Sequence, residues 1–146
     1  MRTTLKNIIN VFQTLAEAHP QINYFHSGEL SEIEMKNIIF PALLLFKKPG
    51  TFTGTQVNIN LDLIYFDLIN SDDSNIDDVH SDALQALTDF ISKLFDDEIE
   101  QIFTVDETNV SFEFLTYVED SNLAAVQATL AIQVPYDLNR CKTIFD

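Results

Sequence analysis

The sequence has one cysteine, no tryptophan, three glycines and four prolines among its 146 residues. A single cysteine, Cys141, cannot form a disulfide within the chain, which fits a protein that assembles in the reducing cytosol. The low glycine and proline content, with 46% hydrophobic residues and twelve phenylalanines, excludes a disordered acidic segment. This length and composition predict one domain over residues 1–146, with 136–146 as a polar C-terminal tail.

Positive charge is scarce as well. Eight Lys and Arg residues stand against 23 Asp and Glu residues, which gives a net charge of −15. Between Asp62 and Asp120 there are seventeen carboxylates and a single cation, Lys93. Such a field disfavours binding to nucleic-acid phosphates and to anionic membranes. It favours solubility, basic partners, or a passage to which DNA does not adhere.

Long hydrophobic runs are absent from the sequence. The longest run, from Ile38 to Phe46, is interrupted by Pro41 and is about half as long as a membrane-spanning helix requires. The first seven residues lack the apolar stretch and the small-residue cleavage site of a signal peptide. We therefore expect neither a membrane partner nor secretion.

The spacing of apolar residues predicts two amphipathic helices. The first covers residues 3–18 and ends before Pro20, because a residue that precedes proline is disfavoured in the helical conformation. The second covers residues 76–95, and its first turn carries Asp77 and Asp78, whose charges complement the helix dipole.

Alternating and continuous apolar segments predict six strands. Residues 41–48 and 55–69 form a long hairpin, because Lys47 to Gly50 has the composition of a turn. Residues 64–68 are apolar on both faces, which predicts that both sides of this strand end are covered. Residues 28–37 are expected to be an ordered loop or a single helical turn. The predicted strands are 22–26, 41–48, 55–69, 101–105, 110–118 and 126–134.

The order of these elements predicts the fold class. A helix, three strands, a second helix and three further strands are typical of an α+β domain. We expect an antiparallel sheet with both main helices packed on one face.

Residue types used in catalysis and metal binding occur without the required spacing. Acidic residues 72–82 lack the central glycine and alternating ligands of a calcium loop. His80, Ser81 and Asp82 are adjacent, so on a helix they point about 100° apart and cannot form a triad. His19 and His26 have no cysteine partner for zinc. We predict no catalytic, cofactor-binding or metal-binding residue, and no enzyme.

Three segments, taken in order, resemble a known family. They are residues 25–33 (FHSGELSEI) with 40–49 (FPALLLFKKP), residues 72–75 (DDSN) before a helix with 81–83 (SDA), and residues 118–126 (VEDSNLAAV) with 132–135 (IQVP) and 139–141 (NRC). Together they are similar to the tail-terminator or tail-completion proteins of tailed bacteriophages, over roughly residues 3–141. The resemblance implies a virion protein, made in the host cytoplasm, that forms a hexameric or dodecameric ring. That ring joins the portal complex to the tail and leaves a channel for DNA, which passes without sequence-specific binding.

A ring of this kind needs two different contact patches on each subunit. The candidates combine outward apolar positions, the expected hairpin tip and the basic residues of the tail. The candidate interface residues are Lys47, Lys48, Phe66, Leu115, Tyr117, Arg140 and Lys142. Acidic residues that remain once the helix-capping residues are set aside are candidates for the channel or for a subunit seam. These are Asp62, Asp67, Asp96, Asp97, Glu98 and Glu113.

Two other classes of function stay open at this point. An acidic inhibitor, such as an immunity protein or a nucleic-acid mimic, would bind a basic partner by electrostatic steering. An enzyme acting on a small ligand would need a pocket in which perturbed titratable groups converge.

Overall fold

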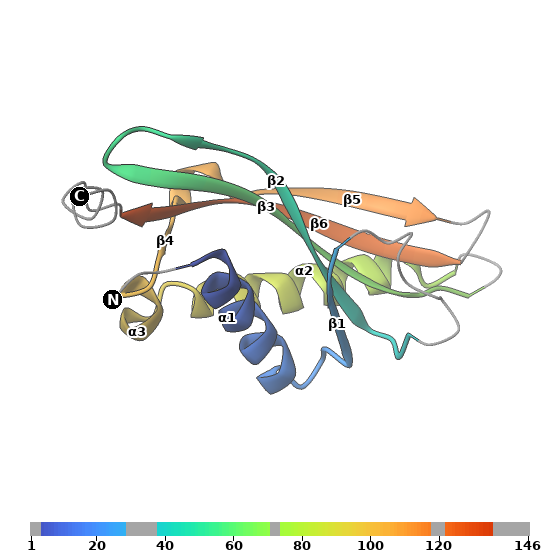
Figure 1. Ribbon diagram of the computed structural model, residues 1–146. Coiled ribbons are helices and arrows are strands. Elements are labelled where there is room, and N and C mark those ends of the chain that lie inside the picture. The colour runs from blue at the N-terminus through green and yellow to red at the C-terminus, as the bar shows by residue number, and fades with distance from the viewer. Residues whose placement is uncertain (1–3, 29–37, 71–73, 118–121, 136–146) are drawn as a thin grey trace.

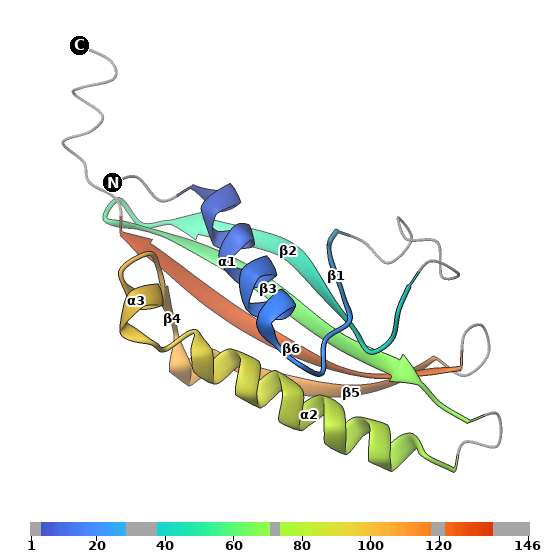
Figure 2. The ribbon, with the colours of Figure 1, turned by 90° about the horizontal axis from the view of Figure 1, so that it is seen from below.

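The structure is a computed structural model, and it describes residues 4–28, 38–70, 74–117 and 122–135. These residues form a mixed sheet of six strands with helices on one face (Figure 1). Helix α1 (Leu5–Ala18) and helix α2 (Ile76–Lys93) confirm the two predicted helices. Both lie on the same side of the sheet, as the view from below shows (Figure 2). The coarse α+β prediction is therefore confirmed.

The sheet has the strand order β1-β2-β3-β6-β4, and β5 also pairs with β6. The strands are β1 (Tyr24–Ser27), β2 (Ala42–Phe52), β3 (Gln56–Leu68), β4 (Thr104–Val105), β5 (Ser111–Tyr117) and β6 (Leu123–Pro135). The prediction of a purely antiparallel sheet is wrong, because β1 runs parallel to β2. Apolar periodicity specifies that a segment is a strand, but it carries no information on the direction of its neighbour.

The hairpin of β2 and β3 is longer than predicted. Strand β2 continues through Lys47 and Lys48 to Phe52, and the turn lies at Thr53, whose N–H donates to the carbonyl of Gln56 at 3.0 Å. The register shifts between Lys48 and Thr51. A β-bulge there accommodates Pro49, which has no N–H to donate. Gly50 is needed at the same bulge, because a Cβ would lie 2.3 Å from the carbonyl oxygen of Asn58.

The helix-covered face of the sheet contains the main core. Phe12 of α1 stacks between Phe90 of α2 and Phe103, with both ring centroids 5.9 Å away. On the sheet side, alternate apolar residues of β2, β3 and β6 cover this core. The core explains why α1 and α2, which are far apart in the chain, pack on one face.

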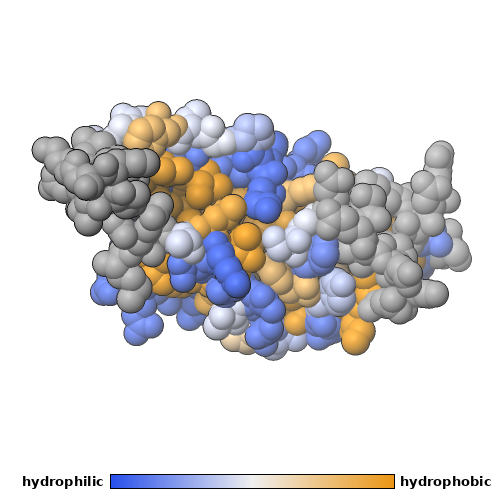
Figure 3. Space-filling view, viewed as in Figure 1, coloured by the Kyte–Doolittle hydropathy of each residue, from blue (hydrophilic) through white to orange (hydrophobic). Residues whose placement is uncertain are grey.

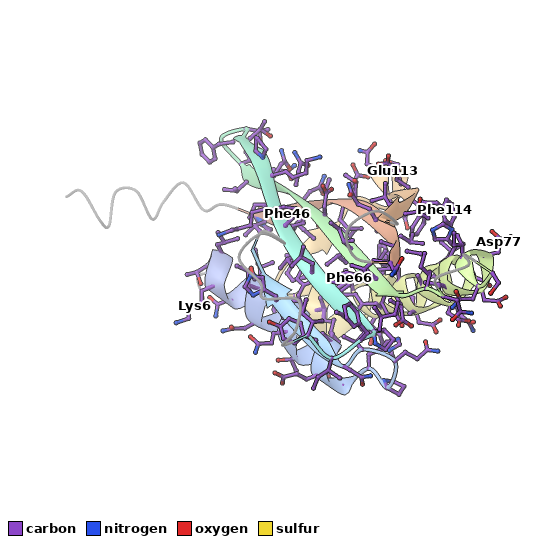
Figure 4. The ribbon with its side chains drawn as sticks, turned by 90° about the vertical axis from the view of Figure 1, so that its right-hand side faces the viewer. Lys6, Phe46, Phe66, Asp77, Glu113 and Phe114 are labelled. Atoms are coloured by element: carbon purple, nitrogen blue, oxygen red, sulfur yellow. The ribbon has the colours of Figure 1, made fainter. Side chains whose placement is uncertain are left out.

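The opposite face, which we call the second face, carries a smaller apolar cluster. Phe66 of β3 packs edge-to-face against Phe40 at 5.7 Å, and Leu44 and Ala125 are buried beside them. Figure 4 shows Phe46 and Phe66 along this part of the sheet. Both sides of the strand are buried at residues 64–66, as the apolar pattern predicts, but the prediction is wrong at its end, because Leu68 is 51% exposed.

Two short helical segments between α2 and β5 do not follow from the apolar pattern. Helix α3 (Asp97–Glu100) is four residues long, and a 3-10 turn follows at Glu107–Asn109. Between them, β4 has only two residues, whereas the sequence predicts a strand over 101–105. The element order therefore differs from the predicted one by α3. The predicted loop at 28–37 lies outside the described residues, apart from Gly28.

Candidate functional surfaces

Asp62 is the one buried charged residue among the described residues, at 6% exposure. It lies on the second face, in β3, between β2 and β6. Its carboxylate accepts hydrogen bonds from Thr129 Oγ1 at 2.8 Å and from Gln127 Nε2 at 3.2 Å, and Lys48 Nζ lies 3.4 Å away. A buried carboxylate with these partners holds three strands together. Its oxygens are engaged within the chain, so we do not assign Asp62 to a channel wall.

Asp67 lies farther along β3, on the helix-covered side. Burial raises the pKa of the Asp67 carboxyl, the hydrogen bond from the Leu68 N–H at 2.8 Å lowers it, and the charge of Asp82 raises it again. Burial, with the charges of Asp67 and Asp82, also raises the pKa of Tyr65 to about 12. The Tyr65 hydroxyl donates to the carbonyl of Gln21 at 3.0 Å. This hydrogen bond therefore links β3 to the segment after α1.

The remaining candidate carboxylates are exposed. Asp96 precedes α3, and Asp97 and Glu98 form its first turn. Glu113 lies in β5, on the second face, because it pairs directly with Gln127. The structure does not bring these residues together with Asp62 at one site.

A stripe of carboxylates on α2, which sequence reasoning did not single out, forms the most regular charged surface. Asp78, Asp82 and Asp89 are exposed and are separated by four and seven residues. On an α-helix this spacing places them within about 40° of one another, along a helix about 27 Å long. We call these three residues the acidic stripe. The sequence signal for this stripe is the spacing of the three aspartates on the polar face of the predicted helix.

The predicted interface residues have different environments. Lys47 is exposed in β2, whereas Lys48 is paired with Asp62. Phe66 is only 3% exposed, so the prediction that it lies on an outer contact patch is wrong, because the second face buries it against Phe40. Leu115 is half-buried against the same cluster. Tyr117 ends β5, and Arg140 and Lys142 lie outside the described residues.

Two other aromatic residues of β5, Phe112 and Phe114, are exposed, at 39% and 53%. They pair with Ala128 and Val126, so they lie on the helix-covered side, but β5 is an outer strand and α2 covers them only in part. His80 of α2 contacts the ring of Phe114 at 5.4 Å, and its Nε2 bonds to the carbonyl oxygen of Leu115 at 2.9 Å. His80 thus fixes the outer strand to α2.

A groove lies between the C-terminal ends of α1 and α2. It has a volume of about 600 Å³, and its lining includes His19, Asp89, Phe90 and Lys93. His19 Nδ1 accepts the N–H of Gln21 at 3.1 Å, so this imidazole nitrogen is engaged in the chain turn after α1. The lining is mainly apolar, and it offers space for an aliphatic or aromatic side chain.

Within the described ranges, no three His, Cys, Asp or Glu side chains are placed to hold a metal ion. Among the helices of the same ranges, none combines the length and the apolar character that a membrane-spanning helix requires.

Comparison of the sequence with protein-family models gives no match, and comparison with curated protein sequences gives none either.

Proposed function

We propose that this protein is a structural subunit of the neck or tail of a tailed bacteriophage. In this proposal it forms or joins a ring that connects the portal complex to the tail, and the ring surrounds a channel for DNA. The fold supports this role through its layered α+β architecture, which agrees with the coarse architecture that the resemblance implies.

The observation that carries the proposal is the acidic stripe on α2. Asp78, Asp82 and Asp89 are exposed along one side of α2, about 120° around the helix from the side that is buried in the core. Cationic contacts to phosphate release counterions and hold DNA on a protein surface. A wall of carboxylates forms no such contacts, so DNA passes along it without being retained. Six or twelve copies of the stripe would line a channel with one sign of charge.

The test of assembly uses the full chain together with the portal and tail proteins encoded next to it. We expect the chain to co-purify with the portal–tail complex and to appear as a ring by electron microscopy. A chain that never joins this complex would contradict the proposal.

The test of the channel uses the triple substitution of Asp78, Asp82 and Asp89 by lysine. Assembled wild-type rings should release double-stranded DNA at low salt, whereas rings with the lysine triple should retain it in a salt-dependent way. The matched control is the triple substitution by asparagine, which removes the charge without adding a cation. If wild-type rings retain DNA as strongly as the lysine triple, the stripe does not line the channel.

The acidic stripe also favours a second candidate, an inhibitor or nucleic-acid mimic. Carboxylates repeated along one helix face could occupy the phosphate-binding groove of a basic enzyme. Tight, salt-sensitive binding of the isolated monomer to a cationic partner, without any association with portal or tail proteins, would support this alternative.

A further inference from the structure

Two sides of the molecule differ in chemistry, and the difference suggests how one copy contacts the next. One side consists of β5 and the adjoining side of α2, which we call the β5 flank. The other consists of α1 and the part of the β2–β3 hairpin that extends beyond β1, which we call the hairpin flank. Figure 4 shows Glu113, Phe114 and Asp77 on one side of the molecule and Lys6 on the opposite side.

The β5 flank presents an outer strand that α2 covers only in part. Within the described residues, β5 pairs only with β6, so its other edge has no strand partner. Natural edge strands are usually protected by lysine, proline or a bulge. Residues 111–117 contain neither lysine nor proline, and they expose the rings of Phe112 and Phe114. Exposed aromatic side chains on an open strand are typical of a contact surface.

The hairpin flank has an apolar hollow. A pocket of about 390 Å³ lies between the start of α1 and the hairpin, and its lining includes Leu5, Lys47, Val57 and Ile59. Figure 3 shows hydrophobic side chains at the surface between α1 and these strands, with hydrophilic groups around them. The pocket lies on the helix-covered side of the sheet, because Lys47 pairs with Leu61 and Leu61 belongs to the main core. Phe112 and Phe114 project on the same side of their own strand.

The charges of the two flanks are complementary. In α1, β1 and β2, Lys6 and Lys47 outweigh Glu17, and Lys48 is already paired with Asp62. On the β5 flank, β5 carries Glu113, and the side of α2 on which His80 contacts β5 carries Asp77. The acidic stripe lies on the other side of α2 and stays outside this contact. Two β5 flanks brought together would place like charges against each other, whereas a β5 flank against a hairpin flank pairs opposite charges.

We propose that the β5 flank of one copy docks on the hairpin flank of a second copy, head to tail. Phe112 or Phe114 fills the pocket beside Leu5, and Asp77 lies near Lys47 or Lys6 at its rim. This inference rests on the proposed ring, since a head-to-tail contact between two different patches is the arrangement that closes a ring.

The test compares four full-length chains by sedimentation at increasing concentration. They are the wild type, Phe114→Ser, Lys47→Glu and the control Leu68→Ser, which removes an equally exposed apolar side chain outside both flanks. We expect wild type and Leu68→Ser to self-associate with the same affinity. Each flank variant should weaken this association by about tenfold or more, the effect of a central interface residue.

A mixture of the two flank variants distinguishes the head-to-tail contact from a symmetric one. Phe114→Ser keeps the hairpin flank intact, and Lys47→Glu keeps the β5 flank intact. An equimolar mixture should therefore form a dimer of one copy of each, and no larger assembly, because the two outer flanks of that dimer are both altered. A wild type that is monomeric up to about 1 mM, a mixture that stays monomeric, or an equal loss in Leu68→Ser would each overturn the inference.

Co-purification with the portal and tail proteins separates this inference from the proposed function. If both flank variants enter the portal–tail complex as well as wild type, the head-to-tail contact is wrong and the proposed function stands. If wild type does not enter that complex, the proposed function fails whatever the self-association shows.

Discussion

The two faces of the sheet use the same strands in different ways. On the helix-covered face, α1 and α2 bury a continuous core around the stacked rings of Phe12, Phe90 and Phe103. On the second face, an apolar cluster around Phe66 adjoins the buried carboxylate of Asp62. The difference shows that a strand in which polar and apolar residues alternate need not have one solvent-exposed and one buried side. A strand such as β3 can bury both sides if its polar groups find partners on neighbouring strands.

The largest expected effect compares the two apolar clusters. Phe12→Ala should lower the free energy of unfolding by about 3–5 kcal/mol, because Phe12 is fully buried and its removal leaves a cavity between two rings. Phe66→Ala should cost less, because the cluster around Phe66 is thinner and can close over the gap more easily. Chemical denaturation of both variants measures the two losses in the free energy of unfolding. Equal losses would show that the cluster on the second face stabilises the fold as much as the main core does.

The next effect concerns the polar part of the second face. Asp62→Ala should cost about 1–3 kcal/mol, because it leaves the Thr129 hydroxyl and the Gln127 amide without their acceptor in a buried site. Lys48→Met should cost less than about 1 kcal/mol, since Lys48 is half-exposed. A double-mutant cycle in chemical denaturation gives the coupling of the pair. A coupling larger than the whole Asp62→Ala loss would mean that the ion pair, not the hydrogen bonds, dominates.

Tyr65 provides a pH test on the helix-covered face. Its folded-state pKa of about 12 lies above the ordinary value of 10.0, so its contribution to stability is complete below pH 10 and is lost as the pH rises towards 12. Tyr65→Phe should remove the hydrogen bond to Gln21 at a cost of about 1 kcal/mol, and it should flatten the stability profile in this window. Unfolding curves between pH 8 and pH 12 test this, and identical profiles for both chains would contradict it.

The smallest effect has the opposite sign. The pKa of Asp67 is raised in the folded state, so the ionised carboxylate destabilises the fold at neutral pH and this cost disappears at low pH. Asp67→Asn should therefore stabilise the protein slightly at pH 7 and leave it unchanged near pH 3, while it keeps an acceptor for the Leu68 N–H. The control is Asp78→Asn, which should destabilise slightly, because Asp78 complements the dipole of α2. Thermal unfolding of both variants and of the wild type, at pH 7 and near pH 3, measures these changes in stability.

Features that depend on residues close together in the sequence can be predicted from it. Features that depend on contacts between distant parts of the chain cannot. Helix α2 and strand β6 were predicted well, because their apolar patterns repeat regularly within the element itself. The sequence predicts a turn at Pro49 and Gly50 where the structure has a bulge, because turns and bulges use the same residue types. Only the close approach of Asn58 on the partner strand distinguishes them.

The candidate surfaces follow the same rule. The excess of acidic residues was visible in the sequence, and so was the spacing that forms the acidic stripe. The burial of Asp62 was not, because its partners Gln127 and Thr129 are more than sixty residues away along the chain. The exposure of Phe114 was also missed, because alternation assigns a side chain to a face but does not show how far the covering helix extends.

The central position of strand β6 in the sheet has a consequence for folding during synthesis on the ribosome. It pairs with β3 on one side and with β4 and β5 on the other, and it contains no charged residue. It is also the last of the described strands to be synthesised. Until it emerges, β3 presents a long bare edge and β5 has no strand to join, a state in which chains readily pair with one another. The numerous carboxylates made before β6 give the nascent chains a mutual repulsion that keeps them apart while this strand is still in the exit tunnel.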